Sequence, residues 1–194
     1  FRRRGYHAAG VDAVMSEAGL TAGGFYAHFP SKEALLAEAL EHAASELACR
    51  LDAILYEIPP HGPARAEAFA AHYLSMSHRA AVEDGCPLVA LAAEVARADE
   101  PVRKAFEAAL LRLADRISDG AARISDGGAA LDRDRAFALV SLCVGALGLA
   151  RSVHDDALAA RILESARAMA TLELQRDSAA RGEAGAGGGD SASR

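Results

Sequence analysis

The sequence predicts an all-α protein with an N-terminal three-helix helix-turn-helix head and a C-terminal helical bundle body. Hydrophobic residues make up 52% of the 194 residues, which is enough to bury a core. Many of them are Ala and Leu, which favour helices, whereas aromatic residues, which favour strands, contribute only 5%. Apolar residues recur at spacings of three and four, and Pro and Gly separate the periodic stretches.

Two short helices joined by a tight turn are predicted near the N-terminus, over residues 10–18 and 21–29. Gly19 supplies the left-handed residue that such a turn needs, and Thr21 is a suitable N-cap for the second helix. Pro30 ends that helix, because a residue before proline is disfavoured in helical conformation. Two short helices around a glycine-containing turn are typical of a helix-turn-helix.

Three segments are expected along the chain. The head covers residues 1–45, and the body, for ligand binding and dimerisation, covers residues 46–176. Residues 177–194 contain no apolar side chain larger than Ala, so we expect a disordered tail. Residues 2–6 look like the end of a helix closed by Gly5, which predicts that the first helix of the head is truncated at its start.

A long helix is predicted to follow the head. Ser31 is a good N-cap for it, and apolar residues keep helical spacing until Pro59 and Pro60 end it. Further helices are expected over residues 63–82, 87–98, 99–123, 133–153 and 156–175.

The charge is distributed unevenly. The formal net charge is −6, yet residues 1–32 hold four basic residues against two acidic ones. This gives residues 1–32 a charge of +2 and leaves −8 on the rest of the chain. A basic head on an acidic body can still bind phosphates, but the asymmetry is too mild to decide the matter.

Enzymatic and metal chemistry find little support in the sequence. No zinc-protease, nucleophile-elbow or nucleotide-loop motif occurs, no cofactor is indicated, and the seven histidines have no metal-ligand spacing. Three scattered cysteines favour reduced thiols in a cytoplasmic protein. Cys86, beside Pro87 at a helix start, could have a lowered thiol pKa and sense redox state, although a buried inert cysteine is commoner. The apolar run 136–150 is too short for a membrane span.

Many fixed offsets near the N-terminus agree with one known pattern. The stretch RRRGYHAAGVDAVMSEAGLTAGGFYAHFPSKEALLAEAL resembles the DNA-binding domain of the TetR family over roughly residues 1–45. The stretch GCPLVALAAEVARADEPVRKAF, residues 85–106, resembles more loosely the body of a TetR subgroup. The matching positions are Gly5, Tyr6, Val11, Val14, Ala18, Gly19, Leu20, Tyr26, His28, Phe29, Lys32 and Leu35.

The resemblance implies a set of DNA contacts. Residues 21–29 correspond to the recognition helix, Tyr26 and His28 to phosphate contacts, and Lys32 to a phosphate-binding lysine at a helix N-terminus, where anions are favoured. The implied DNA-binding residues are Gly10, Val11, Thr21, Ala22, Gly23, Gly24, Phe25, Tyr26, His28 and Lys32.

Two departures from the family pattern stand in this head. Gly10 replaces the usual Ser or Thr and cannot make a side-chain phosphate contact. The base-reading turn, Ala22-Gly23-Gly24, has no hydrogen-bonding side chain, which suggests a close approach of backbone to DNA. Readout must then depend on Thr21, Tyr26, thymine methyl contacts or DNA shape.

The resemblance further implies a cytoplasmic homodimer that represses transcription from a palindromic double-stranded DNA operator and releases it when a small-molecule effector binds. Two alternatives remain: a helical ligand-binding or interaction module without DNA binding, and a Cys-dependent enzyme. The helices 133–153 and 156–175 are expected to dimerise, because the first has two apolar stripes. The expected ligand-lining residues are Phe69, His72, Tyr73, Met76, Phe106, Leu110 and Cys143, with an ordinary core role as the competing interpretation.

Overall fold

The computed structural model describes residues 1–56, 70–124 and 133–186, and all regular elements within these ranges are helical. The all-α prediction is therefore confirmed. The elements are α1 (Val11–Glu17), the 3-10 helix η1 (Ala22–Gly24), α2 (Phe25–His28), α3 (Lys32–Tyr56), α5 (Met76–Ala80), α6 (Pro87–Val95), α7 (Glu100–Ile124), α8 (Arg133–Ser152) and α9 (Asp156–Ala186).

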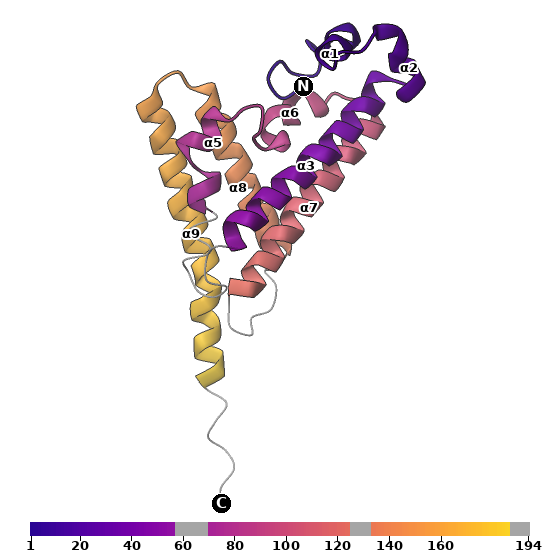
Figure 1. Cartoon of the computed structure of the whole chain (residues 1–194). Coiled ribbons are helices and arrows are strands. Elements are labelled where there is room, and N and C mark those ends of the chain that lie inside the picture. The colour runs from indigo at the N-terminus through magenta and orange to yellow at the C-terminus, as the bar shows by residue number, and fades with distance from the viewer. Residues whose placement is uncertain (57–69, 125–132, 187–194) are drawn as a thin grey trace, which may run out of the picture.

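The helices form a small head at one end of a larger body (Figure 1). The long helices α3 and α7 pack side by side, and α8 and α9 form an antiparallel pair that α7 contacts through α8. Helix α6 lies beneath the N-terminal segment and touches α3, α7 and α8. The head is thus connected to the body both through the continuous helix α3 and through α6.

Two glycines shape the head as the sequence predicts. Gly5 and Gly19 have φ angles of 78° and 71°, the left-handed conformation that side chains disfavour. Gly5 closes a single turn through a 2.7 Å bond from its N–H to the carbonyl of Phe1, and Gly19 ends α1. Ser31 caps α3 as expected, because its Oγ accepts from the N–H of Ala34 at 3.2 Å.

Two apolar clusters hold the molecule together. One joins head and body, with Tyr6, Leu36 and Leu40 packed on Leu91 and Val95 of α6. The larger cluster fills the space among α3, α6, α7, α8 and α9. Its largest fully buried side chain is Tyr73, followed by aliphatic residues. Burial on this scale supplies most of the stability of a helical bundle.

Two helix boundaries differ from the prediction. The helix expected over 63–82 is interrupted after residue 73, and Ser75 starts α5 by accepting the N–H of His78 at 3.1 Å. Helix α9 continues past the expected end at Gln175 and through the start of the expected tail to Ala186. The remainder of that tail and the Pro59–Pro60 helix end lie outside the described residues.

Candidate nucleic-acid interface

The second helix of the head presents one buried and one exposed aromatic residue. Phe25 is fully buried, with its ring centroid 5.6 Å from that of Phe29, whereas Tyr26 is 72% exposed. The two rings of Phe25 and Tyr26 meet edge to face at 5.1 Å. Phe25 therefore packs the helix onto the head, and its side chain is not accessible to DNA. Tyr26 is exposed to solvent, and its ring packs against the buried Phe25 ring.

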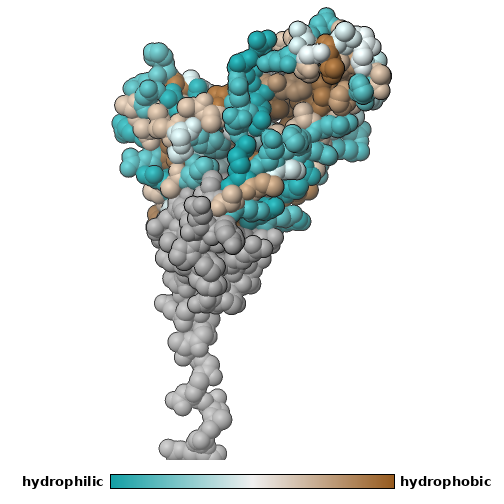
Figure 2. Space-filling view, viewed as in Figure 1, coloured by the Kyte–Doolittle hydropathy of each residue, from teal (hydrophilic) through white to brown (hydrophobic). Residues whose placement is uncertain are grey.

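The surface around Tyr26 is exposed and nearly uncharged. Thr21, Ala22, Gly23 and His28 are all exposed. Figure 2 shows pale and brown atoms, with few teal ones, over the upper right tip of the molecule, where the short head helices lie in Figure 1. A face with so few charges favours apolar and backbone contacts to a partner over ion pairing.

The glycines of this face are not required by packing within the chain. A Cβ added at Gly10 or Gly23 would meet no atom within 4 Å, and neither residue has a positive φ. A Cβ at Gly24 would point inward instead, 3.8 Å from Thr21 Oγ1 and 3.9 Å from Met15 Cε. Gly23, and not Gly24, is therefore the residue whose side-chain position faces outward.

The start of helix 22–28 also differs in detail from the expectation. Its first turn, η1, is 3-10 helix, and Thr21 stands at its N-cap without a side-chain hydrogen bond. The Thr21 hydroxyl is therefore not engaged in capping. Val11, at the start of α1, is half-buried, so only part of its side chain faces solvent.

Lys32 occupies the first position of α3, as the resemblance implied, and has a definite partner. Its ammonium lies 4.2 Å from the centroid of the Tyr6 ring, within the range of a cation–π interaction. The Tyr6 hydroxyl donates to the Glu33 carboxylate. Burial, followed by the Glu33 contact, raises the pKa of Tyr6, and the hydrogen bond from Tyr6 is the main cause that lowers the pKa of Glu33. Lys32 is thus held at the helix start beside an ionised Glu33.

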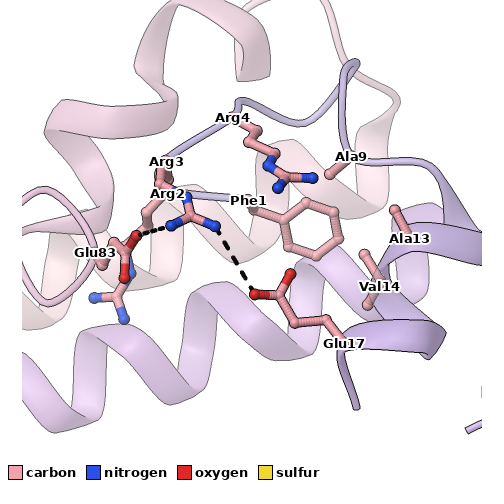
Figure 3. A pocket seen from close by; sticks show the side chains of 9 residues that line it. All are labelled: Phe1, Arg2, Arg3, Arg4, Ala9, Ala13, Val14, Glu17 and Glu83. Carbon is pink, nitrogen blue, oxygen red and sulfur yellow. Dashed lines mark ion pairs between the residues drawn. The ribbon is translucent and has the colours of Figure 1, made fainter. Parts of the chain in front are cut away.

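The three N-terminal arginines mostly face the body. Arg3 pairs with Glu83 at 2.8 Å and lies 3.9 Å from Glu17, while Arg2 donates to the carbonyl of Gly85 at 2.9 Å. Figure 3 shows these side chains around a hollow of about 270 Å³ between the N-terminal segment and α1. Arg2 and Arg3 therefore serve the attachment of head to body.

The expected ligand residues occupy different environments within the part of the chain that the structure describes. Tyr73 and Cys143 are fully buried in the core, His72 and Met76 are exposed, and Phe106 and Leu110 are half-buried; Phe69 lies outside the described residues. A cavity of about 20 Å³, with room for roughly one water molecule, lies instead among α3, α6 and α7. Its lining residues are Ala44, Leu47, Ala48, Cys86, Pro87, Leu88, Ala109, Arg112, Leu113 and Arg116.

The two buried cysteines, Cys86 and Cys143, lack the accessible, activated thiol of a redox sensor. Cys86 is fully buried and hydrogen-bonded to Tyr73, and burial raises the pKa of its thiol despite its position at the start of α6. Burial also raises the pKa of Cys143 to about 12, and Cys49 is the exposed thiol. Of the two interpretations of Cys86, the buried inert thiol is favoured over the activated one, because desolvation outweighs the helix dipole. Among the described residues, no group of three or more His, Cys, Asp or Glu could hold a metal ion.

An apolar face remains uncovered on α8 and α9. Leu149, Leu158, Met169 and Leu172 are 44–62% exposed. They border or continue a groove of about 690 Å³, which the small residues Gly145 and Ala146 also line. Large apolar residues gathered on one side of two helices are typical of a surface that another chain covers.

Sequence reasoning missed the residues that fasten the head to the body, above all Glu94 of α6 and the loop at Gly85. Glu94 Oε2 accepts the backbone N–H groups of Tyr6 and His7, and these contacts span more than eighty positions of sequence. The available signal was Gly5, whose left-handed conformation exposes successive N–H groups as an anion-binding turn.

Two family models match the chain. The model described as "Bacterial regulatory proteins, tetR family" matches residues 1–39, and "Tetracyclin repressor-like, C-terminal domain" matches residues 62–166. No curated protein matches the sequence.

Solved structures share the fold over most of the chain. The reduced form of NemR from E. coli aligns with a TM-score of 0.71 and 25% identity over 87% of each chain. A TetR family transcriptional regulator from Agrobacterium tumefaciens aligns with a TM-score of 0.67 and 21% identity, covering 87% of this chain and 90% of that one. With both its head and more than half of its length matched by TetR models, the chain belongs to the tetR family of bacterial regulatory proteins and is a DNA-binding transcriptional regulator.

Proposed function

We propose that this protein is a dimeric repressor that binds a palindromic operator through residues 21–28 and leaves it when a small molecule enters the body. The observation that carries the proposal is the outward face of η1 and α2, where Tyr26 is exposed on a buried Phe25 and Gly23 has open space beyond it. A recognition helix laid into the major groove needs such an unobstructed face on a rigid base.

The contacts that this face can make predict its mode of readout. Tyr26, His28 and Lys32 reach phosphates, and phosphate contacts position a protein without reading sequence. Ala22 and Gly23 bring backbone and methyl groups close to base edges, so that sequence is read through thymine methyl groups and groove shape. We therefore expect modest direct hydrogen bonding to bases.

A selection experiment tests the DNA-binding proposal. Purified protein is used to enrich duplexes from a random-sequence pool, and binding of the enriched duplex is then measured against a scrambled duplex at several salt concentrations. An inverted repeat with half-site centres about 34–36 Å apart is expected, because two recognition helices enter successive major grooves. Failure to enrich any duplex would favour the alternative of a helical ligand-binding module without DNA binding.

The exposed face of α8 and α9 supports dimerisation through these helices. Leu149 and Leu158 lie beside a groove whose floor contains Gly145, and a Cβ at Gly145 would meet nothing within 4 Å. A second copy of the same face would bury these side chains in a four-helix arrangement. Leu149→Glu should therefore produce monomers in sedimentation. Met76→Glu, which changes an exposed apolar residue outside the groove, should leave the dimer intact.

The effector site requires the small cavity to enlarge. Helices α3, α6 and α7 surround it with mainly apolar side chains, and two arginines stand among the lining residues. An apolar molecule inserted there would push these helices apart. Compounds that raise the melting temperature and also release the enriched duplex would identify the effector class.

Cytoplasmic location belongs to the same proposal. By length and apolar composition, α8 is the one helix among the described residues that could cross a membrane. Its inward side chains, such as Leu139, Val140 and Leu147, are instead buried in the body core.

A further inference from the structure

The N-terminal segment of the head is bound to the end of α6 by a single carboxylate. Glu94 Oε2 accepts the N–H of Tyr6 and, at 3.2 Å, the N–H of His7. Glu94 is half-buried, and the apolar cluster of Tyr6 with Leu91 and Val95 packs beside these hydrogen bonds. Hydrogen bonds to a charged acceptor are stronger than neutral ones, so this contact is an effective fastening.

Gly5 makes this fastening possible. Its φ of +78° turns the following N–H groups toward Glu94, and a Cβ at this position would collide with the Glu94 carboxylate. The backbone conformation therefore favours glycine here, and any side chain at this position would displace the Glu94 carboxylate from its place. By contrast, Gly19 has the same type of φ but no atom within 4 Å of its Cβ position.

A second fastening lies at the opposite end of α6. Arg2 donates to the carbonyl of Gly85 at 2.9 Å, and Arg3 pairs with Glu83 at 2.8 Å (Figure 3 shows Arg2, Arg3 and Glu83). The loop itself is held from the body, because Arg151 of α8 donates to the carbonyls of His78 and Ala81. A Cβ at Gly85 would come within 2.5 Å of the Ala81 carbonyl and 2.6 Å of an Arg151 guanidinium nitrogen, so Arg151 packs closely on this loop.

Helix α6 therefore connects the body cavity with the head. Cys86, Pro87 and Leu88 at its start line the cavity, and Glu94 near its end binds the head. Because α6 is one continuous helix, both fastenings attach the N-terminal segment to the same element of the body.

We propose that Glu94 is a positioning residue for DNA binding: it fixes the orientation of the head relative to the body. The proposal rests on the function proposed above, and it adds the residue that holds the head in place. Helix α3, which also joins head and body, is the competing explanation of a fixed head. With Glu94 intact the head is held in the orientation that suits the operator, and the DNA-competent population is high.

The first experiment measures head orientation without DNA. Spin labels are placed at Ser16→Cys in the head and His154→Cys in the body, both exposed positions, in a Cys49→Ser background. Labelled chains are diluted with unlabelled protein, so that the distance distribution reports on one chain whether or not the protein dimerises. We expect a narrow distribution of distances between the two labels when Glu94 is intact, and a broadened or shifted distribution in the Glu94→Ala variant.

Arg97→Ala is the matched control. Arg97 is an exposed charged residue just beyond α6, and within the described part of the chain no side-chain hydrogen bond or ion pair joins it to the head. Its removal should leave the distribution narrow. Glu94→Gln retains one acceptor oxygen, so its distance distribution should have a width between those of the wild-type protein and Glu94→Ala. If Glu94→Ala does not fold, Glu94→Gln serves as the test variant. Unchanged distance distributions in every folded Glu94 variant would overturn the proposal and mean that α3 alone fixes the head orientation.

The second experiment is a double-mutant cycle on operator affinity, with the duplex enriched by the wild-type protein as the probe. Glu94→Ala should weaken binding about tenfold, within the usual range of coupling between sites. Gly5→Ala should weaken it at least as much, because its Cβ displaces the carboxylate. The double variant should bind about as well as Gly5→Ala alone, since the collision partner is gone.

The outcomes of the cycle separate this proposal from the function on which it rests. If the loss of operator affinity in the double variant equals the product of the two single losses, the two positions act independently, which would contradict direct contact between them. A melting temperature that falls in step with affinity for Glu94→Ala and Arg97→Ala alike would mean that Glu94 has only a structural role. If no duplex is enriched, the DNA-binding function fails, whereas the spin-label distances still decide whether Glu94 orients the head.

Discussion

His78 should make the folded protein less stable in mild acid. Its ring is buried, and Nδ1 lies 2.8 Å from the carbonyl of Tyr73, while the N–H of Cys86 points at Nε2 from 3.2 Å. Because a carbonyl only accepts, Nδ1 must carry the proton, and because the Cys86 N–H donates, Nε2 must be bare. The geometry therefore selects one neutral tautomer. A second proton on Nε2 would face the N–H of Cys86.

The pKa of His78 agrees with this geometry. Burial lowers it from 6.5 to about 4, the hydrogen bond to Tyr73 opposes the shift, and the nearby charges of Arg151, His72 and Arg50 assist it. Unfolding therefore takes up a proton between these pH values, so the free energy of unfolding falls as the pH drops below 6.5. Linkage gives a loss of roughly 2 kcal/mol between pH 7 and pH 5 for a fully shielded ring, and about 1 kcal/mol when the solvent near its edge is allowed for.

Urea unfolding at pH 7 and pH 5, at one fixed protein concentration, measures this effect. The comparison is with His78→Gln, because other histidines, including His72, contribute their own pH dependence. The wild-type protein should lose about 1 kcal/mol more than the variant between the two pH values. At pH 7 the variant should already be less stable by about 1–3 kcal/mol, since the Cys86 N–H loses its acceptor. Equal losses in both proteins would refute the neutral, singly protonated ring.

Further predictions concern the head and the thiols. Phe25→Ala should destabilise the head by about 3–5 kcal/mol, visible as an early helical loss by circular dichroism while the body melts unchanged; a single unshifted transition would contradict it. Lys32→Ala should weaken all duplexes about equally and reduce the salt slope by about one unit, and a selective loss on the operator would be the opposite result. Ellman's reagent should modify Cys49 rapidly and the buried Cys86 and Cys143 only on unfolding. Gly23→Leu should abolish preference for the operator without destabilising the head, in contrast to Gly24→Leu.

Features set by neighbouring residues could be predicted from the sequence. The turn at Gly19 and the start of α3 at Ser31 depend on the local conformational preferences of one or two residues, and both occur as expected. The burial of Phe25 opposite the exposed Tyr26, with Phe29 half-buried on the side of Phe25, follows from helical spacing in the same way. The helix break at Ser75 has a local cause too, but a strong apolar periodicity on both sides concealed it.

Features that depend on distant segments could not be predicted. The ligand-lining set was chosen from residue types on predicted helices, and packing sent Tyr73 and Cys143 into the core but His72 to the surface. Two interpretations of Cys86 stood open, an activated thiol at a helix start and a buried inert one, and desolvation by other helices, which raises its pKa, favours the second. Glu94 carried no signal of its own, because its partners are backbone groups more than eighty positions away.

The two adjacent glycines of the recognition segment show how far such reasoning reaches. The sequence indicates that two residues of low helix propensity, each costing about 1 kcal/mol relative to Ala, stand where bases are read. It cannot say which one faces outward, because η1 is a 3-10 turn and shifts the faces relative to an α-helix. The structure points the Cβ position of Gly24 toward Met15 and leaves that of Gly23 open. Neither of the two glycines is required by packing within the chain, because the contacts at Gly24 are ordinary van der Waals distances. Gly23 is the one that faces outward, where an approaching DNA surface would require a residue without a side chain. If Gly23→Leu leaves operator affinity unchanged in a folded head, that surface does not approach there, and readout must come from Tyr26 and the phosphate contacts.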